Sequence, residues 1–445
     1  MQRILIIGGG YAGFYTAWRL EKRLRRGEAE VTIVDPRPYM TYQPFLPEVA
    51  SGSIEPRHVA ISLRSELRRT RIIAGSVLEL HHDRRSATVR PAEGPDRALD
   101  YDIVVVTAGA VTRTFPIPGV RDDAIGLKYV EEAVAIRDRL LTAFDRAATL
   151  PAGPERAALL SMTFVGGGFS GIEGFGELLS LATALFKHYP ELSFPELRFH
   201  LVEAASRILP EVTDGPGRWV VRHLEERGAL IHLGTQLLSA RDGHVVLSNG
   251  EEFDTGLLVW TAGNASTPIV AKHTDLPIDA RGRLLVRSDL RVGTEDDPVE
   301  DAWGAGDDAA VPDLAGPAGS TTVPNAQHAV RQGKRLAKNL LASIRGRRTK
   351  PYVHHSLGVV ATLGLGRGIF QYRRLVITGV VAWLMHRGYH VLAVPTWQRK
   401  VRVLLIWATA VLFGRDVVSL RSTEHPRAAF EASGEPAPAA ASWGD

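Results

Sequence analysis

The chain has 445 residues, of which 45% are hydrophobic and 23% charged, and its formal net charge is +4. This is the composition of an ordinary globular protein, and the length allows roughly two to four domains. The sequence contains no cysteine, which excludes disulfides, thiolate-bound metals, iron–sulfur clusters and a catalytic dithiol. Because cysteine is absent and the chain enters an apolar strand almost at once, we expect an intracellular protein without a signal peptide.

The opening stretch has the pattern of a dinucleotide-binding unit. An apolar run over residues 3–7 leads into Gly8, Gly10 and Gly13, and an amphipathic segment follows. In this context the first glycine permits a tight turn, the second lets the backbone approach a pyrophosphate, and the third lets the helix pack closely on its strand. The N–H groups at the start of that helix then face the phosphates. A second apolar run, 31–34, ends in Asp35, at the place where an acid meets a ribose hydroxyl.

Two segments extend this first unit. The loop at 39–52 is rich in proline and aromatic residues, and it is either a structural connection or part of a cofactor lining. The β-branched run 103–106 ends in Thr107, Ala108 and Gly109. A fully apolar run that ends in small residues is typical of a central parallel strand whose carboxyl end meets a ligand. Residues 115–119 then break the chain and mark a crossing between domains.

The second half of the chain repeats this pattern after a predicted helix at 129–147. The repeated positions are the glycines Gly166, Gly168 and Gly171, the acid Glu203 after the strand 198–202, and Ala262 and Gly263 after the strand 257–260. Two such units imply two dinucleotides, and the reaction that this suggests is hydride transfer from a nicotinamide to a flavin. Glu203 favours NADH, because a carboxylate repels the 2′-phosphate of NADPH, whereas the nearby Arg207 leaves NADPH open.

A turn of small residues with an acid follows the repeat, at Gly306 and Asp307. Asp307 can hydrogen-bond a ribityl chain or bind phosphate through water, and it can equally cap a helix. The next predicted helix begins near Ala326 and runs to about Leu341, and its N-terminal end can direct partial positive charge at the edge of a flavin ring.

On these residues the chain resembles the type II NADH:quinone oxidoreductases, within the glutathione-reductase-like flavoproteins. The resemblance covers about residues 1–415. The matching motifs are 8–13, 42–50, 165–173, Trp260-Thr261-Ala262-Gly263, Gly306-Asp307, 326–329 and 358–364. One departure concerns the motif Ala-Gln-x-Ala-x-Gln, in which Arg331 replaces the second glutamine and His328 a typically apolar residue.

The resemblance implies tightly but non-covalently bound FAD at the first site, NADH as the substrate at the second, and a quinone as the acceptor. It places Glu173 near the nicotinamide–flavin contact and Gln327 on the quinone side of the flavin. The cofactor-binding residues expected from motif and resemblance together are Gly8, Gly10, Ala12, Gly13, Asp35, Gln43, Ala108, Gly109, Asp307, Ala326, Gly166, Gly168, Gly171, Glu203, Ala262 and Gly263. No metal site is expected.

The segment from Arg345 to Arg415 contains twelve basic residues and no acid. Between its charges lie two apolar stretches, 375–385 and 403–413, each shorter than the roughly 20 residues that a spanning helix needs. Basic flanks and tryptophans favour amphipathic helices on an anionic membrane surface. The alternatives are a helix pair in the protein core and a dimer interface. Nucleic-acid binding is not expected, because the apolar runs argue against it.

We therefore expect an α/β fold with two Rossmann-like domains, one for FAD and one for NADH, and a C-terminal amphipathic helical region for membrane association. The expected limits are 1–118 with 289–345 for FAD, 119–288 for NADH, 346–420 for the membrane-associating region and 421–445 for a disordered tail. The expected protein is peripheral, on the cytoplasmic side of the cell membrane, and a possible homodimer. Two other functions stay open: a soluble NADH oxidase or ferredoxin-type reductase, and a flavin-binding sensor with little turnover.

Overall fold

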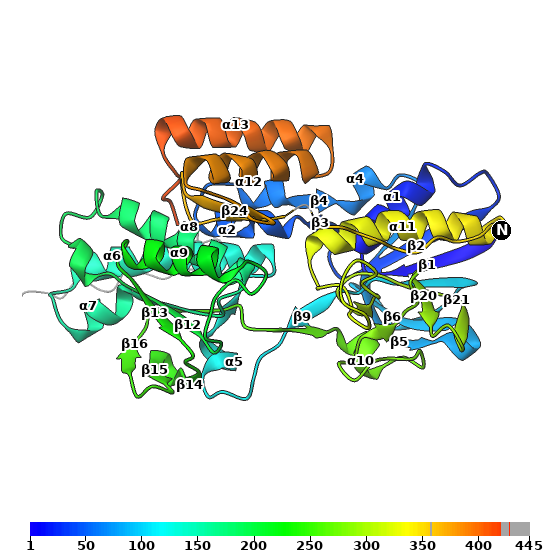
Figure 1. Ribbon diagram of the computed structural model, residues 1–445, viewed down its shortest axis with the longest axis horizontal. Helices are drawn as coiled ribbons and strands as arrows, with labels where there is room; N and C mark the ends of the chain where they lie inside the picture. Colours follow the sequence, from blue (N-terminus) through cyan, green and yellow to red (C-terminus); the bar gives the residue numbers. More distant parts are fainter. Residues whose placement is uncertain (357, 420–426, 428–445) are drawn as a thin grey trace, which may run out of the picture.

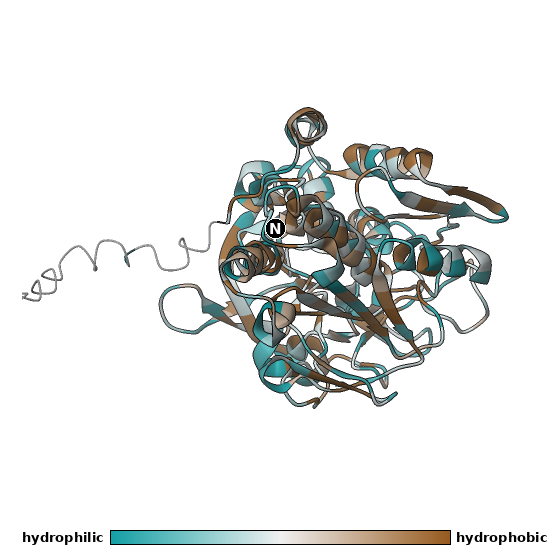
Figure 2. Cartoon of the chain, turned by 90° about the vertical axis from the view of Figure 1, so that its left-hand side faces the viewer, coloured by the Kyte–Doolittle hydropathy of each residue, from teal (hydrophilic) through white to brown (hydrophobic). Residues whose placement is uncertain are grey.

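The computed structural model describes residues 1–356, 358–419 and 427. Two lobes, each built on a twisted sheet with helices around it, lie side by side, and two C-terminal helices lie across the top of the molecule in Figure 1. The strands of both sheets are largely hydrophobic (Figure 2), and one cluster of buried apolar side chains runs through both lobes.

The first lobe contains an eight-stranded sheet in the order β20-β21-β8-β1-β2-β5-β6-β7. Its strands are β1 (Gln2–Ile7), β2 (Ala29–Asp35), β5 (Arg71–His81), β6 (Ser86–Pro91), β7 (Arg97–Asp100), β8 (Ile103–Val106), β20 (Arg291–Gly293) and β21 (Pro298–Gly304). The central strand β1 pairs in parallel with β2 and β8. Residues 4–7 of β1 are buried, which is the pattern of a parallel strand covered on both faces.

Two long helices cover this sheet, α1 (Tyr11–Glu21) and α11 (Ala326–Ile344). They pack against each other (Figure 1), and Gly333 makes the close approach possible, since a Cβ there would lie 2.5 Å from the Ala12 carbonyl oxygen. The predicted helix from residue 326 is thereby confirmed and runs three residues beyond Leu341.

The second lobe contains a five-stranded parallel sheet in the order β10-β17-β11-β12-β13. Its strands are β10 (Ile125–Gly126), β11 (Ser161–Val165), β12 (Arg198–Glu203), β13 (Ala229–Leu233) and β17 (Leu257–Trp260). Its helices are α6 (Val130–Thr149), α7 (Pro154–Leu159), α8 (Phe169–Leu185) and α9 (Asp214–Glu225). A small antiparallel sheet joins β14 (Leu237–Ser239), β15 (His244–Leu247) and β16 (Glu252–Asp254).

The chain crosses between the lobes twice, and the two crossing segments pair with each other. These are the antiparallel strands β9 (Ala110–Thr112) and β18 (Asn264–Ser266). Directly after the second crossing, α10 (Pro268–Lys272) contacts β5 of the first sheet. A short helix of the first half, α2 (Leu46–Ala50), contacts α6 and α8 of the second lobe. The expected domain limits stay a prediction.

The remaining elements are short. They are β3 (Tyr39–Thr41), β4 (Ala60–Ser62), β19 (Leu284–Leu285), β22 (Ala309–Ala310), α3 (Pro56–Val59), α4 (Leu63–Glu66), α5 (Val120–Asp123) and the 3-10 turns η1 (Gln43–Phe45), η2 (His82–Arg84), η3 (Phe194–Glu196) and η4 (Arg241–Gly243).

The C-terminal region is not purely helical. An antiparallel sheet of β23 (Val359–Thr362), β24 (Gly368–Tyr372) and β25 (Leu375–Thr378) precedes α12 (Val380–Ala393) and α13 (Trp397–Phe413). The expectation of a helix over the whole stretch 375–385 is therefore wrong. Arg373 reverses the chain in the left-handed conformation, with φ 53°, so Val376 pairs with Gln371 and the β-branched run forms a strand.

No helix among residues 1–356 and 358–419 is long and apolar enough to cross a membrane. The predicted disordered tail, 421–445, lies outside the described residues except for residue 427. The fold class is confirmed: an α/β protein with two Rossmann-type units.

Candidate functional site

A cavity of about 660 Å³ lies at the carboxyl ends of β1, β2 and β8, which is where open parallel sheets bind ligands. The sequence-predicted residues that line it are Gly8, Gly10, Ala12, Asp35, Gln43, Ala108, Gly109, Asp307 and Ala326. They come from six separate places in the chain: 8–12, 35, 43, 108–109, 307 and 326. Residues 267–269 and 273, which follow the second crossing, also line the cavity, and nothing in the sequence pattern pointed to them.

The three fingerprint glycines of the first unit meet different surroundings. Gly8 has φ +94°, and a Cβ there would lie 2.3 Å from the Thr107 carbonyl oxygen. A Cβ on Gly13 would lie 1.9 Å from the Gly8 carbonyl oxygen, so this glycine packs the helix onto the turn instead of lining the cavity. A Cβ on Gly10 would meet no atom within 4 Å. The open backbone at Gly10 and the start of α1 fit a dinucleotide pyrophosphate.

Asp35 fixes the glycine turn through its carboxylate. Its Oδ2 accepts a hydrogen bond from Gly9 N at 2.7 Å and its Oδ1 one from Arg37 N at 2.7 Å. Burial raises the pKa of this carboxyl, and the two backbone donors oppose the rise. The side chain also lines the cavity, so it is positioned for a ribose hydroxyl.

A second acid, Asp307, also lines the cavity. Burial raises the pKa of Asp307, and the nearby Lys128 ammonium opposes that rise. Burial lowers the pKa of Lys128, which Asp307 in turn opposes. Both residues line the cavity, and together they provide an acceptor and a donor for a polar ligand chain.

The second unit repeats the hydrogen bonds and close approaches of the first glycine turn. Gly166 has φ +113°, and a Cβ on Gly171 would lie 2.0 Å from the Gly166 carbonyl oxygen. The Glu203 carboxylate accepts hydrogen bonds from Gly167 N at 2.5 Å and Ala205 N at 2.7 Å. A Cβ on Gly168 would meet no atom within 4 Å. The sequence repeat is therefore a repeat of binding geometry.

A threonine locks each turn in the same way. The Thr107 hydroxyl donates to the carbonyl oxygens of Ile7 and Gly8, both at 3.0 Å. The Thr261 hydroxyl donates to the carbonyl oxygens of Val165 and Gly166, at 2.9 and 3.1 Å. Ala262 and Gly263 follow this threonine as Ala108 and Gly109 follow the first one. The small residues keep the strand end open.

Arg207, which lies four residues after Glu203, is already engaged. Its guanidinium donates to Asp214 Oδ1 at 2.7 Å and to the Val212 carbonyl oxygen. An arginine held by these partners is not free to bind a 2′-phosphate.

Glu173 lies in the first turns of α8 and is buried, with 8% of its surface exposed. Its Oε1 accepts a hydrogen bond from Thr362 N at 3.1 Å and lies 3.1 Å from His386 Nε2. Burial raises the pKa of this carboxyl to about 8. Both contacts come from the C-terminal region, which joins Glu173 to α12.

Gln327 lies in the first turn of α11 and is partly exposed. It is not among the residues that line the cavity. The side chain of Arg331 donates to the Gln327 carbonyl oxygen at 3.0 Å. Gln332 is buried and its Oε1 accepts from Gly306 N at 2.8 Å, so it holds the Gly306-Asp307 turn.

The sequence pattern did not predict two buried ion pairs between the core and the C-terminal region. Glu48 of α2 accepts from the Trp407 indole at 2.7 Å and pairs with Arg387 at 3.2 Å. Glu177 pairs with Arg415 at 2.8 Å. The expectation that these two arginines flank a membrane surface is therefore wrong. A signal was available: a segment without acids must pair any buried cation with an acid elsewhere in the chain.

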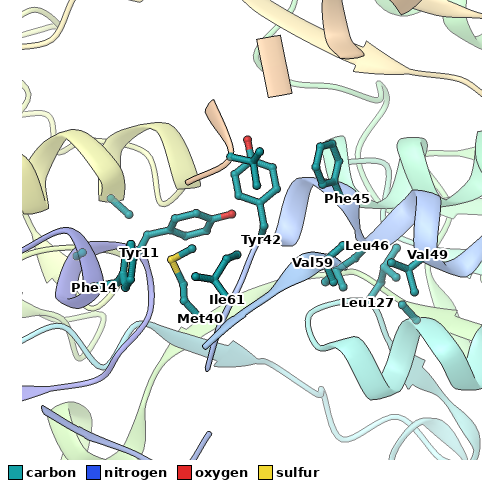
Figure 3. Packing of buried hydrophobic residues seen from close by; sticks show 14 of the residues in the cluster. Tyr11, Phe14, Met40, Tyr42, Phe45, Leu46, Val49, Val59, Ile61 and Leu127 are labelled. Carbon is teal, nitrogen blue, oxygen red and sulfur yellow. The ribbon is translucent and has the colours of Figure 1, made fainter. Parts of the chain in front are cut away.

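Tyr42 completes the contact between the cavity wall and α12. Its ring lies edge-on to that of Tyr11, with centroids 6.0 Å apart, and Tyr11 lines the cavity. The Tyr42 hydroxyl points away from Met40 toward the C-terminal segment (Figure 3) and lies 3.0 Å from His390 Nδ1.

Comparison with known proteins gives consistent matches over nearly the whole chain. A "Probable NADH dehydrogenase" of Dictyostelium discoideum is 27% identical over 94% of this chain and 91% of that protein. The "Type II NADH:quinone oxidoreductase Ndh" of Mycobacterium tuberculosis is 25% identical over 93% and 89%. The structure of NDH2 from Plasmodium falciparum in complex with NADH has a TM-score of 0.85 at 17% identity, covering 94% of this chain and 99% of that one.

A family model matches residues 2–333, which include both glycine fingerprints and both acids. This chain has no cysteine, so it lacks the redox disulfide to which the family name refers. By this match and by its two repeated dinucleotide units, the chain belongs to the pyridine nucleotide-disulphide oxidoreductase family.

Proposed function

We propose that the protein is an FAD-dependent NADH dehydrogenase that passes two electrons from NADH to a membrane quinone without pumping protons. The observation that carries this proposal is the duplicated binding geometry, in which Asp35 and Glu203 hold equivalent glycine turns. The names of the relatives support a quinone as the acceptor. The absence of cysteine supports direct transfer without a dithiol relay.

Residues 1–118 and 289–345 hold FAD in this proposal, and residues 119–288 hold NADH. The flavin supplies two-electron chemistry when it is bound. Gly8, Gly10 and Gly13 shape the pyrophosphate turn, while Asp35 and Asp307 bind hydroxyl groups along the cavity. Gly166, Gly168 and Gly171 do the same for NADH, and Glu203 selects it over NADPH. The remaining small residues, Ala12, Ala108, Gly109, Ala262, Gly263 and Ala326, leave room for the rings.

Glu173 and Gln327 are the proposed catalytic residues. Glu173 lies buried where α8 meets the C-terminal region, and Gln327 lies at the start of α11, next to the cavity-lining Ala326. Gln43, which lines the cavity and donates to the Lys128 carbonyl oxygen at 3.3 Å, positions the flavin from the other side.

The C-terminal helices carry the proposed membrane contact. Large apolar side chains on their outer faces are more than half exposed: Val380, Val381, Leu384, Leu392, Trp397, Leu404, Leu405, Leu412 and Phe413. An apolar face of this kind with basic flanks binds anionic bilayers. We place the protein peripherally on the cytoplasmic side of the cell membrane. A homodimer that covers part of this face is the alternative use.

The test is anaerobic turnover with purified protein and anionic phospholipid vesicles that contain menaquinone or ubiquinone. The proposal predicts equal consumption of NADH and formation of quinol. Consumption with oxygen or a ferredoxin alone would assign the protein to the soluble reductases. No NADH consumption at all, with flavin bound, would favour a sensor.

A further inference from the structure

A second cavity, of about 370 Å³, lies at the C-terminal ends of α1 and α11. Six residues line it: Arg23, Lys338, Leu341, Ala342, Arg345 and Arg347. In Figure 1 these helix ends lie near the N-terminus of the chain, on the side of the first lobe that faces away from the second lobe. The same two helices begin at the first cavity, with Tyr11 and Ala326. The two cavities therefore lie at opposite ends of one helix pair, and four of the six residues at the second one are cationic.

One arginine holds the two sides of this cavity together. Arg345 Nε and Nη2 donate to the two carboxylate oxygens of Glu28, each at 2.9 Å. Nη2 also donates to the Arg23 carbonyl oxygen at 2.8 Å. The chain turns back after α11, so that Arg347 N donates to the Ala342 carbonyl oxygen at 2.7 Å. These bonds fix the loop after α1 against the turn after α11, and they position the cations that the two segments carry.

The other three cations at the cavity have no acid to balance them. Arg23, Lys338 and Arg347 form no salt bridge among the residues that the structure describes, whereas Glu28 is taken by Arg345. Desolvation lowers the pKa of Lys338, and four neighbouring cations lower it further: Arg335, Arg19, Arg23 and Lys350. The C-terminal end of a helix carries about half a negative charge, so the ends of α1 and α11 offset about one of the three charges. About two positive charges are left without a partner.

The chemistry that fits this arrangement is that of a phosphate group. Phosphate carries up to two negative charges and offers oxygen acceptors in several directions, whereas a carboxylate carries one charge. The planar fork of an arginine binds two phosphate oxygens at once, and a lysine binds them as a point charge. A nucleobase is not expected here, because none of the six lining residues is aromatic and proteins hold unpaired bases largely by stacking.

We propose that the cavity at the C-terminal ends of α1 and α11 binds a phosphate-bearing anion through Arg23, Lys338 and Arg347. The phosphate group comes from one of two sources, a soluble phosphate or pyrophosphate and the headgroup of an anionic phospholipid. The bound anion bridges α1 and α11, offsets the repulsion among their cations and stabilises the first lobe. This site is separate from the proposed electron transfer, since none of its six residues lines the first cavity.

The first test is a calorimetric titration of the holoenzyme with inorganic pyrophosphate, at constant ionic strength and with saturating NAD⁺ so that the second glycine turn is occupied. We expect native protein to bind pyrophosphate, and the double variant Lys338→Gln with Arg347→Gln to have a dissociation constant at least about ten-fold higher, because two charge-assisted contacts are lost. Both positions are exposed, so the double variant folds. Lys338→Arg keeps the charge and stays within about three-fold of native affinity. The control is Arg25→Gln with Arg26→Gln, which removes two exposed cations of the loop after α1 that do not line the cavity.

The second test identifies the source of the phosphate group. The same proteins are mixed with vesicles of phosphatidylglycerol or of phosphatidylcholine, and bound protein is measured by flotation. If a lipid headgroup occupies the cavity, the double variant of Lys338 and Arg347 binds phosphatidylglycerol vesicles about ten-fold more weakly than the control does. Binding to phosphatidylcholine vesicles is then equal in the two variants, since this headgroup has no net charge.

Pyrophosphate binding that only the cavity variant loses supports the site with a soluble source. A selective loss of binding to phosphatidylglycerol, without binding of pyrophosphate, supports the site with a lipid headgroup. Equal behaviour of the cavity variant and the control in both tests would overturn the proposal, whether both keep their affinity or both lose it. Neither test involves turnover, so a protein that reduces no quinone would overturn the proposed function and leave this prediction intact.

Discussion

The two dinucleotide units differ in the helix that follows each glycine turn, although their backbones are alike. Asp35 and Glu203 hold equivalent N–H groups, and Thr107 and Thr261 lock equivalent carbonyls. When Gly8 is aligned with Gly166, Glu173 of α8 corresponds to Tyr15 of α1. α1 thus presents an aromatic ring where α8 presents a buried acid.

This difference separates the backbone turns proposed to bind the dinucleotides from the side chains proposed to react. The glycine turn, with its acid and its threonine, has the same geometry in both units, so it does not distinguish between the two proposed dinucleotides. The acids of α8 instead face the C-terminal region, through His386 and Arg415. Of the two proposed catalytic residues, Glu173 therefore lies where the second unit meets α12, and Gln327 lies at the start of α11.

The largest effect is expected from the third glycine of each fingerprint. Gly13→Val places atoms where even a Cβ would lie 1.9 Å from a backbone oxygen, so the turn opens and the protein purifies without flavin. Gly171→Val, with the equivalent contact at 2.0 Å, keeps the flavin absorbance and loses saturation by NADH. The control is Gly153→Ala, which meets no atom within 4 Å. Retention of flavin by Gly13→Val would break the proposed assignment of the two sites.

The next largest effect is expected from breaking a buried ion pair. Glu48→Gln leaves the Arg387 guanidinium buried beside a neutral group, and such changes cost about 3–5 kcal/mol. Because Arg387 also stacks on Trp383 and Trp407, we expect the C-terminal helices to detach first. Limited proteolysis and thermal unfolding measure this directly. The exposed pair Arg90–Asp96 serves as the comparison, since Asp96→Asn should change stability little.

The pH dependence of stability follows from the raised pKa of Glu173. The folded protein binds this proton more tightly than the unfolded chain, whose carboxyl has a pKa near 4.5. Stability from this group is therefore complete at low pH and falls as pH rises from about 4.5 to about 8. Between pH 6 and pH 9 the native Tm falls by about 5 °C or more, and Glu173→Gln has a flatter profile. An equally steep fall in the variant would contradict the raised pKa.

A smaller, selective effect is expected at Glu203. Glu203→Ser removes the carboxylate that disfavours a 2′-phosphate, so the ratio of kcat/KM for NADH over NADPH falls by about ten-fold, or about 1.4 kcal/mol. Asp35→Ser, the equivalent change in the first unit, lowers flavin content without altering this ratio. Steady-state kinetics with both nucleotides on each variant gives the answer, and an unchanged ratio in Glu203→Ser would refute the selectivity.

The fold and the two glycine turns could be predicted from the sequence because they depend on residues that are close together in the chain. Glycines with positive φ, such as Gly8 and Gly166, and apolar runs that end in small residues have one structural solution. The duplicated spacing then predicted the parallel strands at the centre of the first sheet and in the second sheet. The predicted residues that line the cavity came largely from the same motifs.

The contacts of the C-terminal region could not be predicted from the sequence, because ion pairs between residues 200 to 350 positions apart leave no local pattern. Arg387 and Arg415 read as solvated charges, yet they meet Glu48 and Glu177 inside the protein. The apolar stretch 375–385 is compatible with a strand or a helix, and the turn at Arg373 makes its first part, Leu375–Thr378, a strand, whereas the rest begins α12. His386 and His390 carried no motif at all.

The smallest effect in this series concerns the outer face of α13. Leu405 and Leu412 are 62% and 74% exposed, and burying each in a bilayer contributes about 1–2 kcal/mol. Leu405→Ser with Leu412→Ser should weaken binding to anionic vesicles about ten-fold or more in a flotation assay. Leu238→Ser is the control, because Leu238 is 50% exposed on the second lobe. Equal loss in the control would remove α13 from the membrane contact.

The most direct test of the central claim is an anaerobic titration of the purified protein followed through its flavin absorbance. Addition of NADH bleaches the flavin, and menaquinone then restores the oxidised spectrum within one turnover. Recovery on oxygen or a protein acceptor alone would contradict the quinone assignment, and a flavin that NADH does not bleach would contradict the reading of the second unit as its NADH site.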